Sequence, residues 1–239
     1  MSHHDVIVAG IGGMGSAACH HLAKRGLRVL GLERHGLGHE RGSSHGLTRI
    51  IRLAYQEGEH YVPLLRRAHA LWRETGEAAG VRLLHVTGSL DIAPESDGSV
   101  QRSIASCVGH GLAHEVLDHA GLARRAPAFR LPAGHIANFQ PDGGFVASER
   151  AIVAHAGLAQ RDGAELRFDE PILSWRTTAA GGVEVRTGRT TYTAGHLVLA
   201  AGAWMPGLVP ALGRVGTTVK QAIGWFATRR PELFEPPLV

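Results

Sequence analysis

A glycine-rich turn near the start of the chain is the first feature that could bind a ligand. Gly10, Gly12 and Gly15 have the G-x-G-x-x-G spacing, after the apolar run 6–9 and before a helical pattern over 16–25. In such turns the first glycine permits the tight bend, the second lets the backbone approach a pyrophosphate, and the third lets helix and strand pack closely. The helix N-terminus adds N–H groups and a partial positive charge, so this segment predicts a dinucleotide site.

An acidic residue stands where such a site needs one. A second apolar segment, 28–32, ends at Glu33. A carboxylate at that place accepts hydrogen bonds from ribose hydroxyls and repels a 2′-phosphate, which argues against NADP. The fingerprint alone does not choose between NAD and FAD. The alternative is a glycine turn that binds nothing, and the flanking strand, helix and carboxylate weigh against it.

A second group of residues suited to chemistry lies in the segment GSSHGLTRIIRLAYQEG, residues 42–58. We expect a helix from about residue 46 to residue 55. The spacing of four between His45 and Arg49, and of three between Arg49 and Arg52, would then bring these side chains to one side. Arg52 could hold a carboxylate through two parallel hydrogen bonds. The alternative is a solvated arginine face without a ligand.

Composition excludes several classes of protein. The 239 residues are 44% hydrophobic and 19% charged, which is typical of a globular chain. The net charge of +4 is spread without a Lys/Arg run, so we expect no nucleic-acid partner. The 16 histidines show no metal-ligand spacing, so we expect no metal.

The cysteines and the apolar runs indicate where the protein lies. Cys19 and Cys107 make no disulfide framework, and we expect Cys19 to be a small core residue. No apolar run is long enough to span a membrane and no targeting segment is evident, so we expect a cytoplasmic protein.

Several segments together resemble a known family. The chain is similar to the N-terminal part of monomeric sarcosine oxidase and N-methyltryptophan oxidase, FAD-dependent amine oxidases of the D-amino-acid-oxidase superfamily. The segment 42–58 is the most specific to that family, and Leu47 departs from it because the family has an aspartate there. The resemblance is carried by residues 1–40, GSSHGLTRIIRLAYQEG at 42–58, YVPL at 61–64, PDGGFVASERAI at 141–152 and LVLAAGAW at 197–204.

The resemblance implies roles for the residues of the 42–58 segment. His45 and Arg49 would lie against the flavin ring, where a fixed cation stabilises the negative charge of the reduced form. Arg52 would bind the substrate carboxylate, and Glu57 would pair with Arg52 when substrate is absent. The expected catalytic residues are therefore His45, Arg49 and Arg52. The expected residues that bind the cofactor FAD are Gly10, Gly12, Met14, Gly15, Glu33, Arg34, Ser43, Ser44, Thr48, Ile172, Ala201, Gly202 and Trp204.

The implied reaction is oxidation of a C–N bond in an N-methyl or secondary amino acid. FAD would take the hydride equivalent, the imine would hydrolyse, and O2 would reoxidise the flavin to give hydrogen peroxide. The expected partners are a small amino-acid substrate and O2, with no nucleic acid and no membrane. Two alternatives stay open. One is another FAD or NAD oxidoreductase of the superfamily, of the glycine, D-amino-acid oxidase or dehydrogenase type, and the other is a non-catalytic half-enzyme that binds only nucleotide or a partner.

The expected fold class is α/β, with a Rossmann-like parallel sheet that binds FAD and part of a second, mainly antiparallel sheet of a substrate domain. We expect residues 1–85 and 145–213 to form the FAD-binding domain. Residues 86–144 and 214–239 would form the partial substrate domain. Segments 6–9 and 197–201 are both fully apolar, so we expect them to be adjacent parallel strands. Other strands are expected over 190–194 and 217–228.

The resemblance covers little more than the first half of the family pattern. We therefore expect a fragment that lacks the family's flavin-attachment cysteine, oxygen-activating lysine and second carboxylate-binding lysine. An unpaired strand over 217–228 would expose an edge and favour self-association. On this interpretation the isolated chain has little or no oxidase activity.

Overall fold

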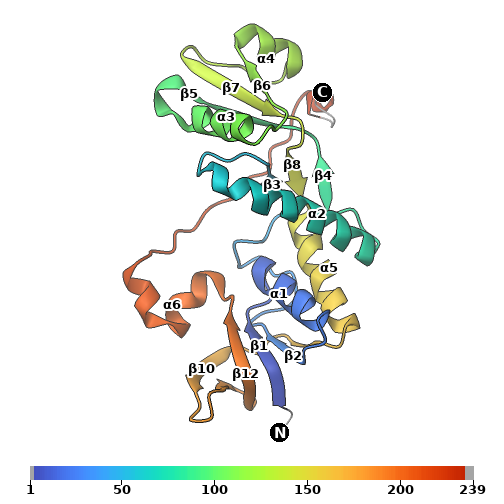
Figure 1. The fold of residues 1–239 in the computed structure, drawn as a ribbon, viewed down its shortest axis with the longest axis vertical. Coiled ribbons are helices and arrows are strands. Elements are labelled where there is room, and N and C mark those ends of the chain that lie inside the picture. Colours follow the sequence, from blue (N-terminus) through green and yellow to red (C-terminus); the bar gives the residue numbers. More distant parts are fainter. Residues whose placement is uncertain (1–2, 235–239) are drawn as a thin grey trace. The chain divides into compact units, whose positions relative to one another are not determined.

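The computed structural model describes residues 3–234, and these divide into two compact units (Figure 1). In the described residues the first unit comprises 3–47, 75–81 and 148–223, and the second comprises the rest. The second unit therefore includes residues 48–74, which the sequence placed with the FAD-binding domain.

A six-stranded sheet forms the centre of the first unit, in the order β10-β11-β12-β1-β2-β9. The strands β12, β1, β2 and β9 run parallel, whereas β10 and β11 are antiparallel additions. Val8 pairs with Val198 in the register of β1 and β12, which confirms the expected adjacency of the two apolar segments. The strands are β1 (His3–Ala9), β2 (Val29–Leu32), β9 (Glu165–Arg167), β10 (Ile172–Thr177), β11 (Val183–Thr187) and β12 (Thr191–Leu199).

Two helices, α1 (Gly13–Ala23) and α5 (Ser148–Arg161), pack against each other beside this sheet (Figure 1). Small and β-branched residues let them approach the strands closely, and Val8, Cys19 and Ala159 are fully buried in one cluster. Cys19 is thus a core residue, as expected, and burial raises the pKa of its thiol to about 12. The protonated thiol is a poor nucleophile at neutral pH.

Gly31 in β2 marks how tightly this layer is packed. A Cβ placed there would lie 2.7 Å from Leu166 Cδ2, 3.0 Å from Ile11 Cδ1 and 3.1 Å from Cys19 Sγ. We predict that Gly31→Ala lowers the free energy of unfolding by about 1–3 kcal/mol, the usual cost of overpacking a core. Urea unfolding followed by circular dichroism measures this loss. Gly157→Ala, in α5 with no atom within 4 Å of its Cβ position, is the control and should not destabilise the chain.

The second unit holds two small antiparallel sheets, with strand orders β3-β8-β4 and β5-β7-β6. The mixed fold class, with a mainly parallel sheet and further antiparallel ones, is therefore confirmed. The strands are β3 (Arg49–Ile51), β4 (Leu84–Val86), β5 (Ser89–Pro94), β6 (Glu115–Leu117), β7 (His135–Gln140) and β8 (Gly144–Val146). The remaining helices of the described chain are α2 (Val62–Ala79), α3 (Ser99–Gly109), α4 (His119–Arg125) and the short α6 (Met205–Leu208), apart from single 3-10 turns.

Three expected elements differ from the structure. The helix over 46–55 is wrong, because Arg49–Ile51 is strand β3 and pairs with β8, with Ile51 buried and its neighbour Ile50 71% exposed. Most of the segments 190–194 and 197–201 belongs to one strand, β12, which pairs with β11 through residues 191–194 and with β1 through residues 193–199. The strand over 217–228 is also wrong, since these residues are exposed and pair with no strand in the described part of the chain. The edge from which self-association was expected does not form there.

Among residues 3–234, no helix combines the length and the apolar character needed to cross a membrane.

Candidate functional site

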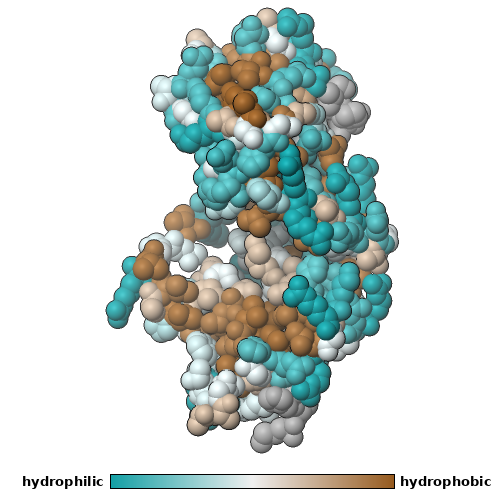
Figure 2. Space-filling model, in the orientation of Figure 1, coloured by the Kyte–Doolittle hydropathy of each residue, from teal (hydrophilic) through white to brown (hydrophobic). Residues whose placement is uncertain are grey.

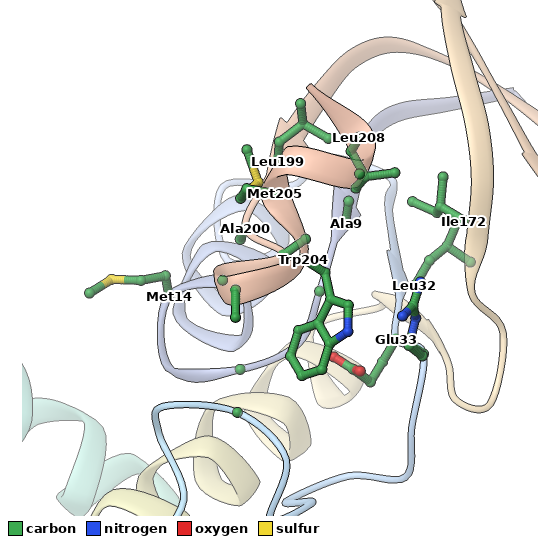
Figure 3. Close-up of a pocket in the computed structure, with 18 of the residues that line it drawn as sticks. Ala9, Met14, Leu32, Glu33, Ile172, Leu199, Ala200, Trp204, Met205 and Leu208 are labelled. Carbon is green, nitrogen blue, oxygen red and sulfur yellow. The ribbon is translucent and has the colours of Figure 1, made fainter. Parts of the chain in front are cut away.

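A cavity of about 780 Å³ in the first unit opens at the carboxyl ends of β1, β2 and β12 (Figure 3). Ligands of open parallel sheets bind at this edge, where loops follow the strands. All the residues expected to bind the cofactor line this cavity except Gly15 and Thr48. Gly15 lies inside the first turn of α1, and Thr48 belongs to the second unit.

Two of the three fingerprint glycines are explained by the fold itself. Gly10 has φ +94°, and a Cβ on it would lie 2.6 Å from the Ala200 carbonyl oxygen. A Cβ on Gly15 would collide with the Gly10 carbonyl oxygen. Both positions therefore exclude a side chain in the protein without any ligand.

Gly12 is different, because its neighbourhood is open. Its φ of −81° is accessible to any residue, and a Cβ there would meet only Ser44 Oγ, at 3.8 Å. Nothing within the described chain requires glycine at this position. The missing side chain instead leaves room over the start of α1 for a group that approaches the backbone closely. A pyrophosphate fits this opening, since N–H groups and the positive end of the helix dipole face it.

The loop that carries Ser43 and Ser44 is held beside the same helix start. Gly13 N–H donates to Ser44 Oγ at 3.1 Å, and Ser43 lines the cavity. Two residues at the beginning of α5 fix the end of the loop: Ser148 Oγ donates to the Gly46 carbonyl at 2.5 Å, and Gly46 N–H donates to Glu149 Oε1 at 2.7 Å. The two serine hydroxyls are thereby placed where they can donate to a phosphate.

The Glu33 carboxylate is held by the backbone around the turn. It is buried, and it accepts hydrogen bonds from Ile11 N–H at 2.7 Å and from His35 N–H at 3.1 Å. Its Oε1 is also 3.4 Å from His39 Nε2. A carboxylate has about four acceptor positions, so it can still accept from ribose hydroxyls. The glycine turn and the acidic residue thus form one structural unit.

Two histidines at this edge were missed by the sequence analysis. His35 lines the cavity, and its Nε2 is buried without a hydrogen-bond partner among the described residues. Burial, together with the charges of His39 and Arg41, lowers the pKa of His35, so the ring is neutral at pH 7. His35 meets Trp204 edge-on with 5.8 Å between ring centroids, and the Arg34 guanidinium lies 5.8 Å from the same Trp204 ring. No spacing motif marks these histidines in the sequence.

Apolar side chains complete the cavity wall. Figure 3 shows Trp204, Leu32 and Ile172 around the opening, with Leu199 at the end of β12 and Met205 at the start of α6 nearby. Hydrophobic surface gathers on the face of the first unit shown in the lower part of Figure 2. Such a lining suits the faces of aromatic rings, which bind in largely apolar pockets with few fixed polar groups.

Arg52 lies in the second unit, within a buried polar network. Its guanidinium pairs with Asp91 and lies 4.4 Å above the centre of the Tyr55 ring. Asp91 Oδ2 also accepts from Ser103 Oγ and Gln140 Nε2, each at 3.1 Å. The expected partner Glu57 is exposed, and Asp91 holds Arg52 instead. A cavity of about 260 Å³ adjoins Arg52 and Asp91.

Loss of the Asp91 carboxylate should leave the Arg52 charge without its partner. We predict that Asp91→Ala lowers the free energy of unfolding by about 2–3 kcal/mol, the upper range for a hydrogen bond to a charged group. The double variant Asp91→Ala/Arg52→Met should recover part of this loss because no unpaired charge remains. Urea denaturation of the two variants measures the difference. Equal stability of wild type and Asp91→Ala would contradict this role.

The common helical face expected for His45, Arg49 and Arg52 does not exist. His45 is half-buried in the first unit, whereas Arg49 and Arg52 belong to the second. Arg49 begins β3 and donates from its guanidinium to the Thr48 carbonyl at 2.7 Å. Arg52 follows the end of β3, so Arg49 and Arg52 share no helical turn that would bring their side chains to one side.

Comparison with known proteins identifies the family to which the chain belongs. The sequence model of a family described as FAD dependent oxidoreductase matches residues 5–234. The chain belongs to this FAD dependent oxidoreductase family. Monomeric sarcosine oxidase of Streptomyces avermitilis is 43% identical over 226 residues, which are 95% of this chain and 59% of the relative. N-methyl-L-tryptophan oxidase of Yersinia pestis is 35% identical over 222 residues, 93% of this chain and 59% of the relative.

Solved structures agree with the family assignment. NikD, described as an unusual amino acid oxidase essential for nikkomycin biosynthesis, superposes with a TM-score of 0.78 at 35% identity. The match covers 89% of this chain and 55% of NikD. The chain of this family member therefore spans a little over half the length of the relatives that it matches. The resemblance to the sarcosine oxidase and N-methyltryptophan oxidase family is confirmed.

Proposed function

We propose that the cavity of the first unit binds FAD, and that the protein oxidises the C–N bond of an N-methyl or secondary amino acid. The observation that carries the proposal is Gly12, a glycine that the fold does not need and that keeps the start of α1 open to the cavity. Glu33, anchored to the same turn, supplies the acceptor for a ribose. Membership of the FAD dependent oxidoreductase family selects FAD over NAD as the dinucleotide.

The residues present fit the pyrophosphate and the adenosine of this cofactor. The N–H groups at the start of α1 and the hydroxyls of Ser43 and Ser44 would hold the pyrophosphate. Ile172 and Leu32 offer apolar contacts at the end of the cavity near Glu33 (Figure 3), where the adenosine would lie. His35 Nε2, buried and without a partner in residues 3–234, offers one further polar contact to the ligand.

Bound FAD would supply the redox chemistry, accepting a hydride equivalent and returning the electrons to O2 as hydrogen peroxide. Arg52 would bind and orient the substrate carboxylate. Its Nε is buried without a hydrogen-bond partner in the described chain, so one donor remains for a ligand beside the Asp91 pair. His45 and Arg49 would add positive charge near the ring, a role that rests on the family resemblance alone.

The experiment that tests the activity measures peroxide release by the chain supplied with FAD. We expect slow peroxide release at most, and any oxidation of sarcosine should exceed that of dimethylamine, which has the same kind of C–N bond but no carboxylate. Arg52→Met should raise the sarcosine KM and leave the dimethylamine rate unchanged. Equal rates for the two amines would contradict the Arg52 role. Binding of FAD without turnover of sarcosine, glycine, D-alanine or pipecolate would favour the nucleotide-binding alternative.

A cytoplasmic location is part of the same proposal. The two cysteines in the described residues, Cys19 and Cys107, are both free and buried. Unpaired cysteines are typical of a reducing compartment.

A further inference from the structure

Three histidines from two helices meet away from the cofactor cavity. His20 and His21 lie in the last turn of α1, and His155 lies in α5. His20 Nδ1 is 3.0 Å from His155 Nδ1, and one ring nitrogen from each of the three residues lies within 4.8 Å of the others. His20 and His155 are 3% and 4% exposed, whereas His21 is half-buried at the edge of the cluster.

The spacing of the ring nitrogens is close to that of metal ligands. Two nitrogens bound to one tetrahedral Zn²⁺ at about 2.0–2.1 Å are separated by about 3.3 Å. The Nδ1 atoms of His20 and His155 are already near that separation, although one hydrogen bond between neutral rings also accounts for it. The half-buried His21 ring stacks on His20 with 4.7 Å between centroids, and one of its nitrogens lies within 4.8 Å of the ring nitrogens of the other two.

The protonation state of the cluster suits metal binding. Burial, with the charges of His20 and His21, lowers the pKa of His155 to about 4. Burial and the His21 charge also lower the pKa of His20. Because the rings are neutral at pH 7, a metal needs only a change of tautomer, which moves the proton of one Nδ1 to its Nε2, and no net loss of protons. The charged groups that act on His20 are Asp162, which favours a nearby cation, and Lys24 and Arg161, which oppose one.

We propose that His20, His21 and His155 form a site for a divalent late transition metal such as Zn²⁺. Three imidazoles and one open position, filled by water, make up a common zinc coordination. The C-terminal carbonyls of α1 add negative potential beside the ion. The bound ion would join α1 to α5, at the opposite end of α1 from the glycine turn. Sequence spacing does not reveal the site because α5 begins more than a hundred residues after α1.

The test is titration of the chelator-treated chain with Zn²⁺ alone, by calorimetry and by competition with a chromogenic chelator. We expect one ion per chain and a higher thermal unfolding midpoint with Zn²⁺. His21→Ala and His155→Gln should each weaken binding by at least about tenfold, since loss of even a residue that only supports a metal ligand costs about 10- to 100-fold. His196→Ala, which removes an exposed histidine of β12, is the matched control and should bind as wild type does.

Co²⁺ provides a second readout, since a tetrahedral nitrogen site gives intense visible absorption. Circular dichroism checks whether each variant folds. If His155→Gln does not fold, His21→Ala still tests the site, because His21 is at the edge of the cluster and its loss should disturb the fold least. Absence of Zn²⁺ binding by the wild-type chain would overturn the proposal. Unchanged affinity in folded His21→Ala would overturn it too, because the ion would then be bound elsewhere.

Discussion

Gly12→Val is expected to abolish FAD binding while the chain still folds. The Cβ position of Gly12 has only Ser44 Oγ within 4 Å, at 3.8 Å, so the free protein accommodates a side chain. In the complex, the same side chain would occupy the space of the pyrophosphate. We expect FAD affinity to fall at least about 100-fold, or about 3 kcal/mol. The free energy of unfolding should change by no more than about 1 kcal/mol, the scale of a substitution at a helix N-cap.

Two further glycine variants make this prediction specific. Gly157→Val, in α5 and outside the cavity, places the same side chain in open space and should leave FAD affinity unchanged. Gly15→Ala should destabilise the fold itself, because its Cβ would collide with the Gly10 carbonyl oxygen. Flavin titration and urea denaturation of all three variants separate loss of a ligand site from loss of structure. Wild-type FAD affinity in Gly12→Val would remove the glycine turn from the binding site.

Glu33→Ala has the second-largest expected effect, and it acts on both stability and binding. The substitution leaves the Ile11 and His35 N–H groups without their acceptor in a buried position. We expect a loss of about 1–3 kcal/mol in the free energy of unfolding, the cost of leaving buried donors unsatisfied. Affinity for ADP, which probes the adenosine half alone, should fall about 10- to 100-fold.

Two other glutamate variants serve as comparisons. Glu33→Gln retains one acceptor oxygen and should lose less stability than Glu33→Ala. Glu184→Ala removes the half-buried partner of the exposed Arg176 and should change neither quantity measurably. If Glu33→Ala binds ADP as wild type does, Glu33 serves only to hold the turn and not the ribose.

Local patterns predicted the parts of the site that lie close together in the sequence. The glycine turn, its flanking strand and helix, and Glu33 occupy consecutive segments, and their spacing alone places them at one sheet edge. The pairing of β1 with β12 was also predictable, because both strands carry the continuous apolar pattern of buried parallel strands.

Features set by distant partners were not predictable from one sequence. The segment around Arg49–Ile51 has spacing compatible with a helix, and only its pairing with β8 makes it a strand. Asp91 meets Arg52 because β5 and the loop after β3 share a polar network through Gln140 and Ser103. The 217–228 segment alternates like a strand, yet it has no strand neighbour in the described residues. Strand hydrogen bonds need such a neighbour, which alternation alone does not supply.

The cavity at the carboxyl ends of β1, β2 and β12 is expected to bind FAD. Equilibrium titration of the purified wild-type chain with FAD, followed by flavin fluorescence and with ADP as competitor, tests it most directly. We expect saturable binding of one FAD per chain, displacement by ADP, and loss of both in Gly12→Val. No saturable binding to a folded wild-type chain, or binding that ADP and Gly12→Val leave unchanged, would contradict it.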